Sequence, residues 1–74
     1  MPRTDFMLRG GHIALDGLLK ATGLAASGGA AKVLIAGGGV SVNGEVERRR
    51  GRKLRAGDEV KVGDRRVAIA GDPG

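Results

Sequence analysis

The spacing of apolar residues changes at Gly39, and this change divides the chain into two kinds of structure. Before Gly39, leucine, isoleucine and alanine recur three and four residues apart, as they do on one face of a helix. After Gly39, Val40 and Val42 alternate with polar residues, as they do in a strand with one buried face. The sequence therefore predicts an α+β domain, with two short packed helices against a small, mainly antiparallel sheet.

The two helices are predicted at about 14–22 and 27–37. Each carries apolar residues at i, i+3 and i+4, which are Leu15, Leu18 and Leu19 in the first helix and Ala31, Leu34 and Ile35 in the second. Ser27 is a natural N-cap for the second helix, because its hydroxyl can accept a hydrogen bond from a free amide of the first turn. We expect the helices to pack through the two apolar stripes.

The hairpin at 40–48 is the clearest feature of the second half. Strands are expected at 40–43 and 45–48, because Asn43 and Gly44 both tolerate the positive φ of a type I′ turn. Val46 is expected to return to the apolar face of the hairpin. Two further strands are expected, one on each side of a turn at 63–64, and another strand is expected at 5–9. Residues 71–74 are expected to be a frayed tail.

Composition narrows the function classes. The 74 residues, expected to form one domain over 1–74, include no cysteine and only one histidine, so no metal site is predicted. No apolar run approaches the roughly 20 residues that span a bilayer, and no signal segment is seen, so we expect a cytoplasmic protein without a membrane partner. No phosphate-loop motif or catalytic constellation is present. An enzyme with a cofactor and a small-molecule substrate is therefore not expected.

Positive charge is concentrated after the hairpin. The net charge is +5, and 48–55 hold six basic residues and no acidic one. Like charges this close repel one another, so folding alone is not expected to gain from them. Because strands flank the run, it is expected to form a basic loop held on a folded surface, where arginine suits phosphate oxygens. The pattern predicts nucleic-acid binding. The residues concerned are Arg48, Arg49, Arg50, Arg52 and Lys53.

The glycines after Ser27 provide a second candidate contact. Gly28 and Gly29 would let a phosphate approach the backbone closely while free amides of the first helical turn face it. His12 is a weaker candidate, because a single histidine beside glycines is usually an ordinary loop residue.

The order of these pieces resembles the RNA-binding domain named after small-subunit ribosomal protein S-four. The matching stretch is 15–60, and it carries the family's pattern of a leucine-rich helix, "GLA-S", a helix with A-basic-x-L-I, "G-V-x-VNG", a basic stretch and "G-D". "SGGAAK" is closest to small stand-alone bacterial members of the family. Ala14, Gly17 and Gly28 depart from the pattern, since the family often has basic residues at these positions.

The resemblance implies the fold called the alpha-L RNA-binding motif and a non-catalytic role on structured ribosomal or transfer RNA. Lys32 and the Ser27 end of its helix would form one wall of an RNA groove, and the basic loop would form the other. Asn43, in the hairpin turn, is a further candidate for RNA contact, and the secondary candidates are His12, Lys20 and Arg55.

Two alternatives keep the basic loop but change its partner. One is a DNA-binding protein, since the residues themselves do not distinguish RNA from DNA. The other is an assembly factor whose loop meets an acidic protein. With no Tyr or Trp and a single Phe, recognition is expected to rest on phosphates and backbone shape rather than on base stacking. A monomer is favoured.

Overall fold

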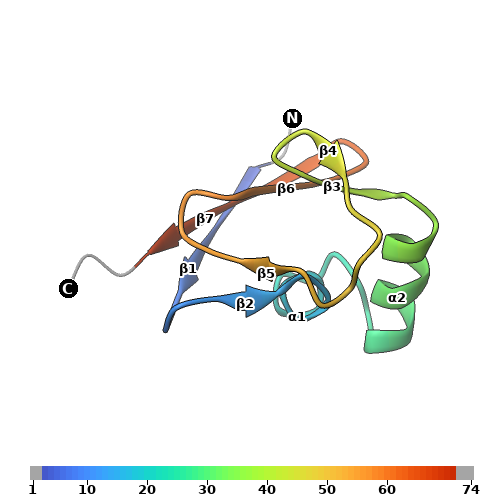
Figure 1. The fold of residues 1–74 in the computed structure, drawn as a ribbon, viewed down its shortest axis with the longest axis horizontal. Helices are drawn as coiled ribbons and strands as arrows, with labels where there is room; N and C mark the ends of the chain where they lie inside the picture. Colours follow the sequence, from blue (N-terminus) through green and yellow to red (C-terminus); the bar gives the residue numbers. More distant parts are fainter. Residues whose placement is uncertain (1–2, 72–74) are drawn as a thin grey trace.

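Two layers make up the fold in a computed structural model that describes residues 3–71. One layer is a five-stranded sheet, and the other holds two helices and a two-stranded sheet (Figure 1). In chain order the elements are β1 (Arg3–Leu8), β2 (Ile13–Ala14), α1 (Leu15–Ala21), α2 (Gly28–Ala36), β3 (Val40–Val42), β4 (Glu45–Val46), β5 (Lys53–Leu54), β6 (Glu59–Val62) and β7 (Arg65–Gly71). The α+β class and both helices are confirmed.

The five-stranded sheet has the order β1-β7-β6-β3-β4. Its pairings are antiparallel except for β1 and β7, which run parallel, with Phe6 opposite Ile69. The first strand of the chain therefore pairs with the last one. β2 and β5 form a separate antiparallel pair that the sequence did not reveal, because two residues are too few to show alternation.

The core lies between the two layers. Leu15, Leu18 and Leu19 of α1 are fully buried, as are Ala31 and Ile35 of α2. The sheet contributes the inward residues of alternate positions, which are Leu8, Val40, Val42, Val60, Val67 and Ile69. Both predicted helical stripes thus face the core, and Ser27 caps α2 by accepting a hydrogen bond from the Ala30 amide at 3.1 Å.

The end of α2 depends on glycine. The Gly38 amide donates to the Ile35 carbonyl and the Gly39 amide to the Leu34 carbonyl, which is the hydrogen-bond pattern of a Schellman motif. This motif requires a residue with positive φ, and Gly38 has φ +80°. The turn directs the chain from α2 into β3, which is the change of structure that the spacing at Gly39 predicted.

The turn between β3 and β4 has the predicted geometry, with φ of 52° at Asn43 and 86° at Gly44. However, β4 ends at Val46 instead of reaching residue 48. The expected place of Val46 is wrong, because Val46 lies opposite Ser41 on the outer face and is 53% exposed. A two-residue turn fixes this register, since it sets Val42 against Glu45 and hence Ser41 against Val46.

One residue of the tail expected at 71–74 belongs to a strand instead. Gly71 is the last residue of β7 and lies opposite Leu8 of β1. Residues 72–74 lie outside the described part of the chain. Within 3–71, no helix has the length and apolar character needed to cross a membrane.

Candidate nucleic-acid interface

Glu47 occupies an inward position at the start of the basic loop. Its amide donates to the Val40 carbonyl at 3.0 Å, so it continues the β3–β4 register by one residue. Val40 faces the core, and the residue opposite it therefore points the same way. The Glu47 side chain is only 9% exposed, and Glu47 is the one charged residue buried within the described chain.

Two arginines of the basic loop turn back to this carboxylate. Arg52 Nη1 lies 2.9 Å from Glu47 Oε1, and Arg49 Nε lies 3.3 Å from Oε2. The Arg49 backbone amide also donates to Oε2 at 3.2 Å. A buried carboxylate is costly unless charged partners and hydrogen bonds satisfy it, so Glu47 determines the path of the chain that follows it.

These contacts change the acidity of Glu47. Hydrogen bonds from the Arg52 and Arg49 side chains, and then from the Arg49 amide, lower its pKa from 4.5 to about 2. Partial burial acts in the opposite direction and is outweighed. The same contact raises the pKa of Arg52, with the hydrogen bond to Glu47 as the main cause. The pair is therefore fully ionised at neutral pH.

The backbone of the basic loop is fastened to the start of α1. The first amides of a helix have no partner within the helix, and Ala14 at the N-cap supplies no side-chain bond. Instead, the Leu15 amide donates to the Arg52 carbonyl at 2.9 Å, and the Asp16 amide to the Arg50 carbonyl at 3.1 Å. The loop carbonyls thus accept hydrogen bonds from the first two amides of α1. The position of the loop therefore depends on a helix that is far away in the sequence.

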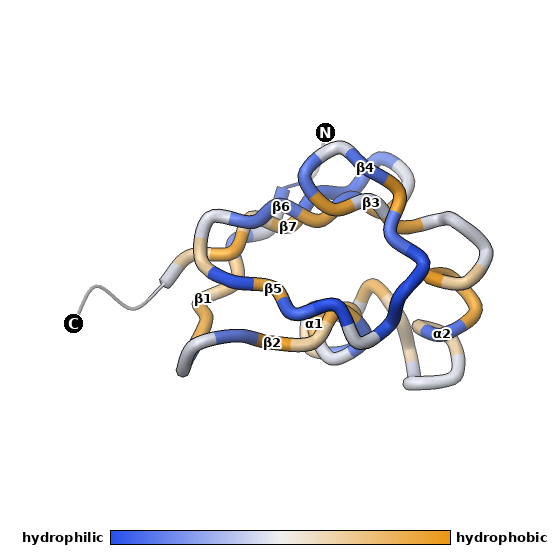
Figure 2. The backbone as a smooth tube through the Cα atoms, viewed as in Figure 1, coloured by the Kyte–Doolittle hydropathy of each residue, from blue (hydrophilic) through white to orange (hydrophobic). Residues whose placement is uncertain are grey.

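The two anchors leave part of the loop's charge free. Arg48, Arg50 and Lys53 are exposed, and none of them takes part in an ion pair with another described residue. Arg49 keeps 81% of its side chain exposed even though it touches Glu47, whereas Arg52 is 34% exposed. In Figure 2 the hydrophilic run descends from β4 in the sheet layer to β5 in the other layer. Four of the five predicted loop cations therefore present charge to solvent.

The loop meets α2 at its C-terminal end. The guanidinium of Arg48 lies over Gly38, close enough that a Cβ on Gly38 would be 3.0 Å from Nη2. Ser27 caps the other end of α2, and a nine-residue helix is about 13 Å long. The loop therefore contacts the C-terminal end of α2 through Arg48 and the start of α1 through its carbonyls, and the groove expected between the loop and the Ser27 end of α2 stays a prediction.

The remaining helical candidates lie at the N-terminal end and in the middle of α2, and in the last turn of α1. The Lys20 side chain, in the last turn of α1, passes close to Gly28, since a Cβ added at Gly28 would lie 3.9 Å from Lys20 Cδ. Ser27, Gly28, Gly29 and Lys32 are all exposed. Their role in binding RNA stays a prediction.

Asn43 has a structural task. Its Nδ2 donates to Asp58 Oδ1 at 3.0 Å, and its Oδ1 accepts from the Glu59 amide at 2.9 Å. Asp58 also accepts from the Arg55 amide, and these two hydrogen bonds, the Arg55 one first, lower the pKa of Asp58. Asn43 thus fastens the hairpin turn to the turn before β6. RNA contact by Asn43, proposed from the sequence, would compete with these bonds.

Two secondary candidates lie apart from the loop's anchors. Arg55 is exposed beyond β5, and His12 is exposed beside an apolar hollow that Phe6, Met7 and Ile13 help to line. In the described residues, no three His, Asp or Glu side chains gather as a metal site would require.

Sequence reasoning missed Glu47, although a signal was present. Once Asn43 and Gly44 form a two-residue turn, the residue opposite Val40 must be number 47, and Val40 is apolar. An acidic residue at an inward position, with arginines two and five residues later, indicates an internal ion pair. The carbonyl contacts to α1 had no comparable signal, because backbone groups are identical in every residue.

The S4 domain family model matches residues 6–70, so the chain belongs to the S4 domain family. A comparison with curated proteins found no match. The family match covers every element from within β1 to β7, including the basic loop and both helices. S4 domains are in general non-catalytic RNA-binding modules, and membership indicates RNA as the partner of this chain.

Proposed function

We propose that this protein is a non-catalytic RNA-binding protein that recognises structured ribosomal or transfer RNA through phosphate and shape contacts. One observation supports the proposal most strongly: two anchors hold the basic loop in a defined position while most of its cations face solvent. Glu47 binds Arg49 and Arg52, and the start of α1 binds the loop carbonyls. A loop so constrained pays less conformational entropy when it binds a phosphate backbone.

The preference for structured RNA rests on what the surface lacks. The chain has one aromatic residue, and Phe6 packs against the core of the fold. Proteins that read unpaired bases commonly stack them on aromatic side chains. Here, exposed arginines can bind phosphate oxygens in pairs, and a fixed array of such contacts favours a backbone of fixed shape.

The proposal includes the remaining properties expected from the sequence. The protein would act in the cytoplasm as a monomer, without a cofactor or a small-molecule substrate. The alternative partners are duplex DNA and an acidic protein, both of which the same loop could attract by charge. Membership in the S4 domain family favours RNA over both.

A competition experiment tests the choice of partner. A labelled RNA hairpin is bound to the protein, and unlabelled hairpin RNA or duplex DNA of equal length is added at constant salt. We expect the RNA to compete at a lower concentration, because the A-form backbone fits the array of loop cations. Equal competition by DNA would favour the DNA-binding alternative.

Crosslinking in cells then identifies the RNA. We expect ribosomal or transfer RNA to dominate the recovered sequences. Recovery of a protein partner that survives nuclease treatment, with no enriched RNA, would instead support the assembly-factor alternative.

A further inference from the structure

The outer face of the five-stranded sheet carries a row of three cations. Arg66 of β7 lies opposite both Arg3 of β1 and Lys61 of β6, so the three side chains occupy one line across three adjacent strands. Residues directly opposite one another project from the same face of a sheet. Because Val67 is buried in the core, its neighbour Arg66 projects from the outer face.

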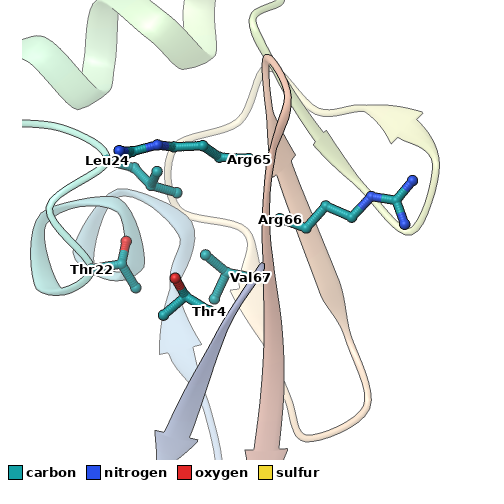
Figure 3. Close-up of a pocket in the computed structure, with 6 residues that line it drawn as sticks. All are labelled: Thr4, Thr22, Leu24, Arg65, Arg66 and Val67. Carbon is teal, nitrogen blue, oxygen red and sulfur yellow. The ribbon is translucent and has the colours of Figure 1, made fainter. Parts of the chain in front are cut away.

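Figure 3 shows that neighbouring side chains of β7 point to opposite faces of the sheet. The Arg65 side chain extends toward Leu24 in the segment that joins the two helices, whereas the Arg66 side chain extends away from that segment. The row is therefore distinct from the helical layer. Neither the change in apolar spacing nor the basic run of the sequence pointed to it, since its members come from both ends of the chain.

Folding does not account for this row. Like charges directly opposite each other in a sheet are destabilising, and here two such pairs share Arg66. Within residues 3–71, Arg66 and Lys61 form no ion pair, and Arg66 Nε is buried without a hydrogen-bond partner. Only Arg3 has a carboxylate nearby, Asp5 at 3.4 Å, and both of these side chains are largely exposed.

The acidic residues of this face lie in the next row. Glu59 and Asp5 both lie opposite Ala68, two positions along the strands from the row of cations. The three cations therefore form an unbroken positive line, with acids on one side of it. A line of this kind would hold an extended anion in one direction across the strands.

The length of the row suits a phosphodiester backbone better than a single small anion. Neighbouring strands are about 4.8 Å apart, so the row spans about 10 Å from β1 to β6. The basic loop joins β4 to β5 and is tied to α1, which covers the opposite face of the sheet. One rigid RNA segment held by the loop would leave the outer row free.

We propose that the outer face binds the phosphate backbone of a second RNA segment, through Arg3, Lys61 and Arg66. The protein would then bridge two RNA segments, one at the basic loop and one at the outer face. This inference rests on the proposed function, because the loop supplies the first RNA contact.

A two-hairpin binding experiment tests the bridge. The same RNA hairpin is prepared with a donor or an acceptor dye, and energy transfer is measured as protein is added below the RNA concentration. Sedimentation then gives the composition of the complex. We expect one protein molecule with two hairpins for the parent chain.

In the outer-face variant, Lys61 and Arg66 are both replaced by glutamine. Its affinity for the first hairpin should equal that of the parent. Its affinity for the second hairpin should be roughly 10- to 30-fold lower, because two phosphate contacts are lost. The loop variant Arg48→Ala with Arg50→Ala should instead weaken the first hairpin. Melting curves check the fold, and the melting temperature should hold or rise because opposed like charges are removed. If the double variant does not fold, Lys61→Gln alone replaces it, since this side chain is exposed.

Each outcome separates the two proposals. An outer-face variant that matches the parent in both binding steps, while the loop variant is impaired, overturns the bridge and leaves the proposed function standing. A complex of two proteins with two hairpins overturns the bridge as well, since dimerisation would explain it. Failure of the parent to bind hairpin RNA contradicts the proposed function and, with it, the bridge.

Discussion

Replacing Arg48 and Arg50 with alanine is expected to weaken binding to hairpin RNA by roughly 10- to 30-fold at about 0.15 M salt. Both side chains are exposed and neither pairs with Glu47. Each phosphate contact adds about 0.7 to 0.9 to the slope of log affinity against log salt, because it releases condensed counterions. Two lost contacts should therefore flatten the slope by roughly 1.4 to 1.8, to a similar degree for different RNA sequences.

A matched control separates the loop from general charge. Arg9→Ala with Arg65→Ala removes the same net charge from exposed residues outside the proposed contacts. We expect this control to change affinity and slope much less than the loop variant. Equal losses in the two variants would mean that net charge alone attracts the RNA and that the loop is merely a solvated surface.

Glu47→Gln is expected to lower the melting temperature by several degrees at neutral pH. The substitution keeps the size of the side chain but removes the charge that holds Arg49 and Arg52, and it leaves Arg52 with a weaker partner in a partly buried place. The measurement is thermal unfolding by circular dichroism. Glu45→Gln is the control in the same hairpin, because Glu45 is exposed and forms no ion pair within residues 3–71.

The effect of Glu47→Gln should depend on pH with a definite sign. The pKa of Glu47 is lowered on folding, from 4.5 to about 2, so its contribution is complete above pH 4.5 and is lost as the pH falls toward 2. The difference between parent and variant should narrow across this range. A variant as stable as the Glu45→Gln control at neutral pH would show that Glu47 does not anchor the loop.

The helices and the central hairpin follow from local patterns. The stripes of α1 and α2, the Ser27 cap and the Asn43–Gly44 turn each need only a few neighbouring residues, and all have the predicted form. The pair β2 and β5 could not be predicted in this way. Its strands have two residues each, and each pairs with a segment far away in the sequence.

Val46 and Glu47 show where pattern reading went wrong. Hydrophobicity suggested that Val46 faces the core, whereas the register of a two-residue turn places Glu47 there. Counting across the turn would have given the correct answer. In a short edge strand, the pairing register decides which side chain is buried, because a shift of one residue moves every side chain to the other face. The hydrophobicity of a single residue is then a poor guide to its burial.

The candidate site was predicted as a set of charges but not as an arrangement. Charge density alone located the basic loop, because a run of arginines is visible in one dimension. Its attachment to α1, and the row formed by Arg3, Lys61 and Arg66, depend on which strands and turns meet in space. The parallel pairing of β1 with β7 brings Arg3 beside Arg66, and no local pattern indicates that pairing.

The central claim is that RNA binds at the basic loop, and mapping backbone amides during an RNA titration tests it most directly. Nitrogen-labelled protein is titrated with hairpin RNA, and the amide signals are followed by NMR. The account predicts the largest changes at 48–53 and in Leu15 and Asp16, whose amides donate to the loop carbonyls. Saturating binding with unchanged signals at 48–53 would contradict it.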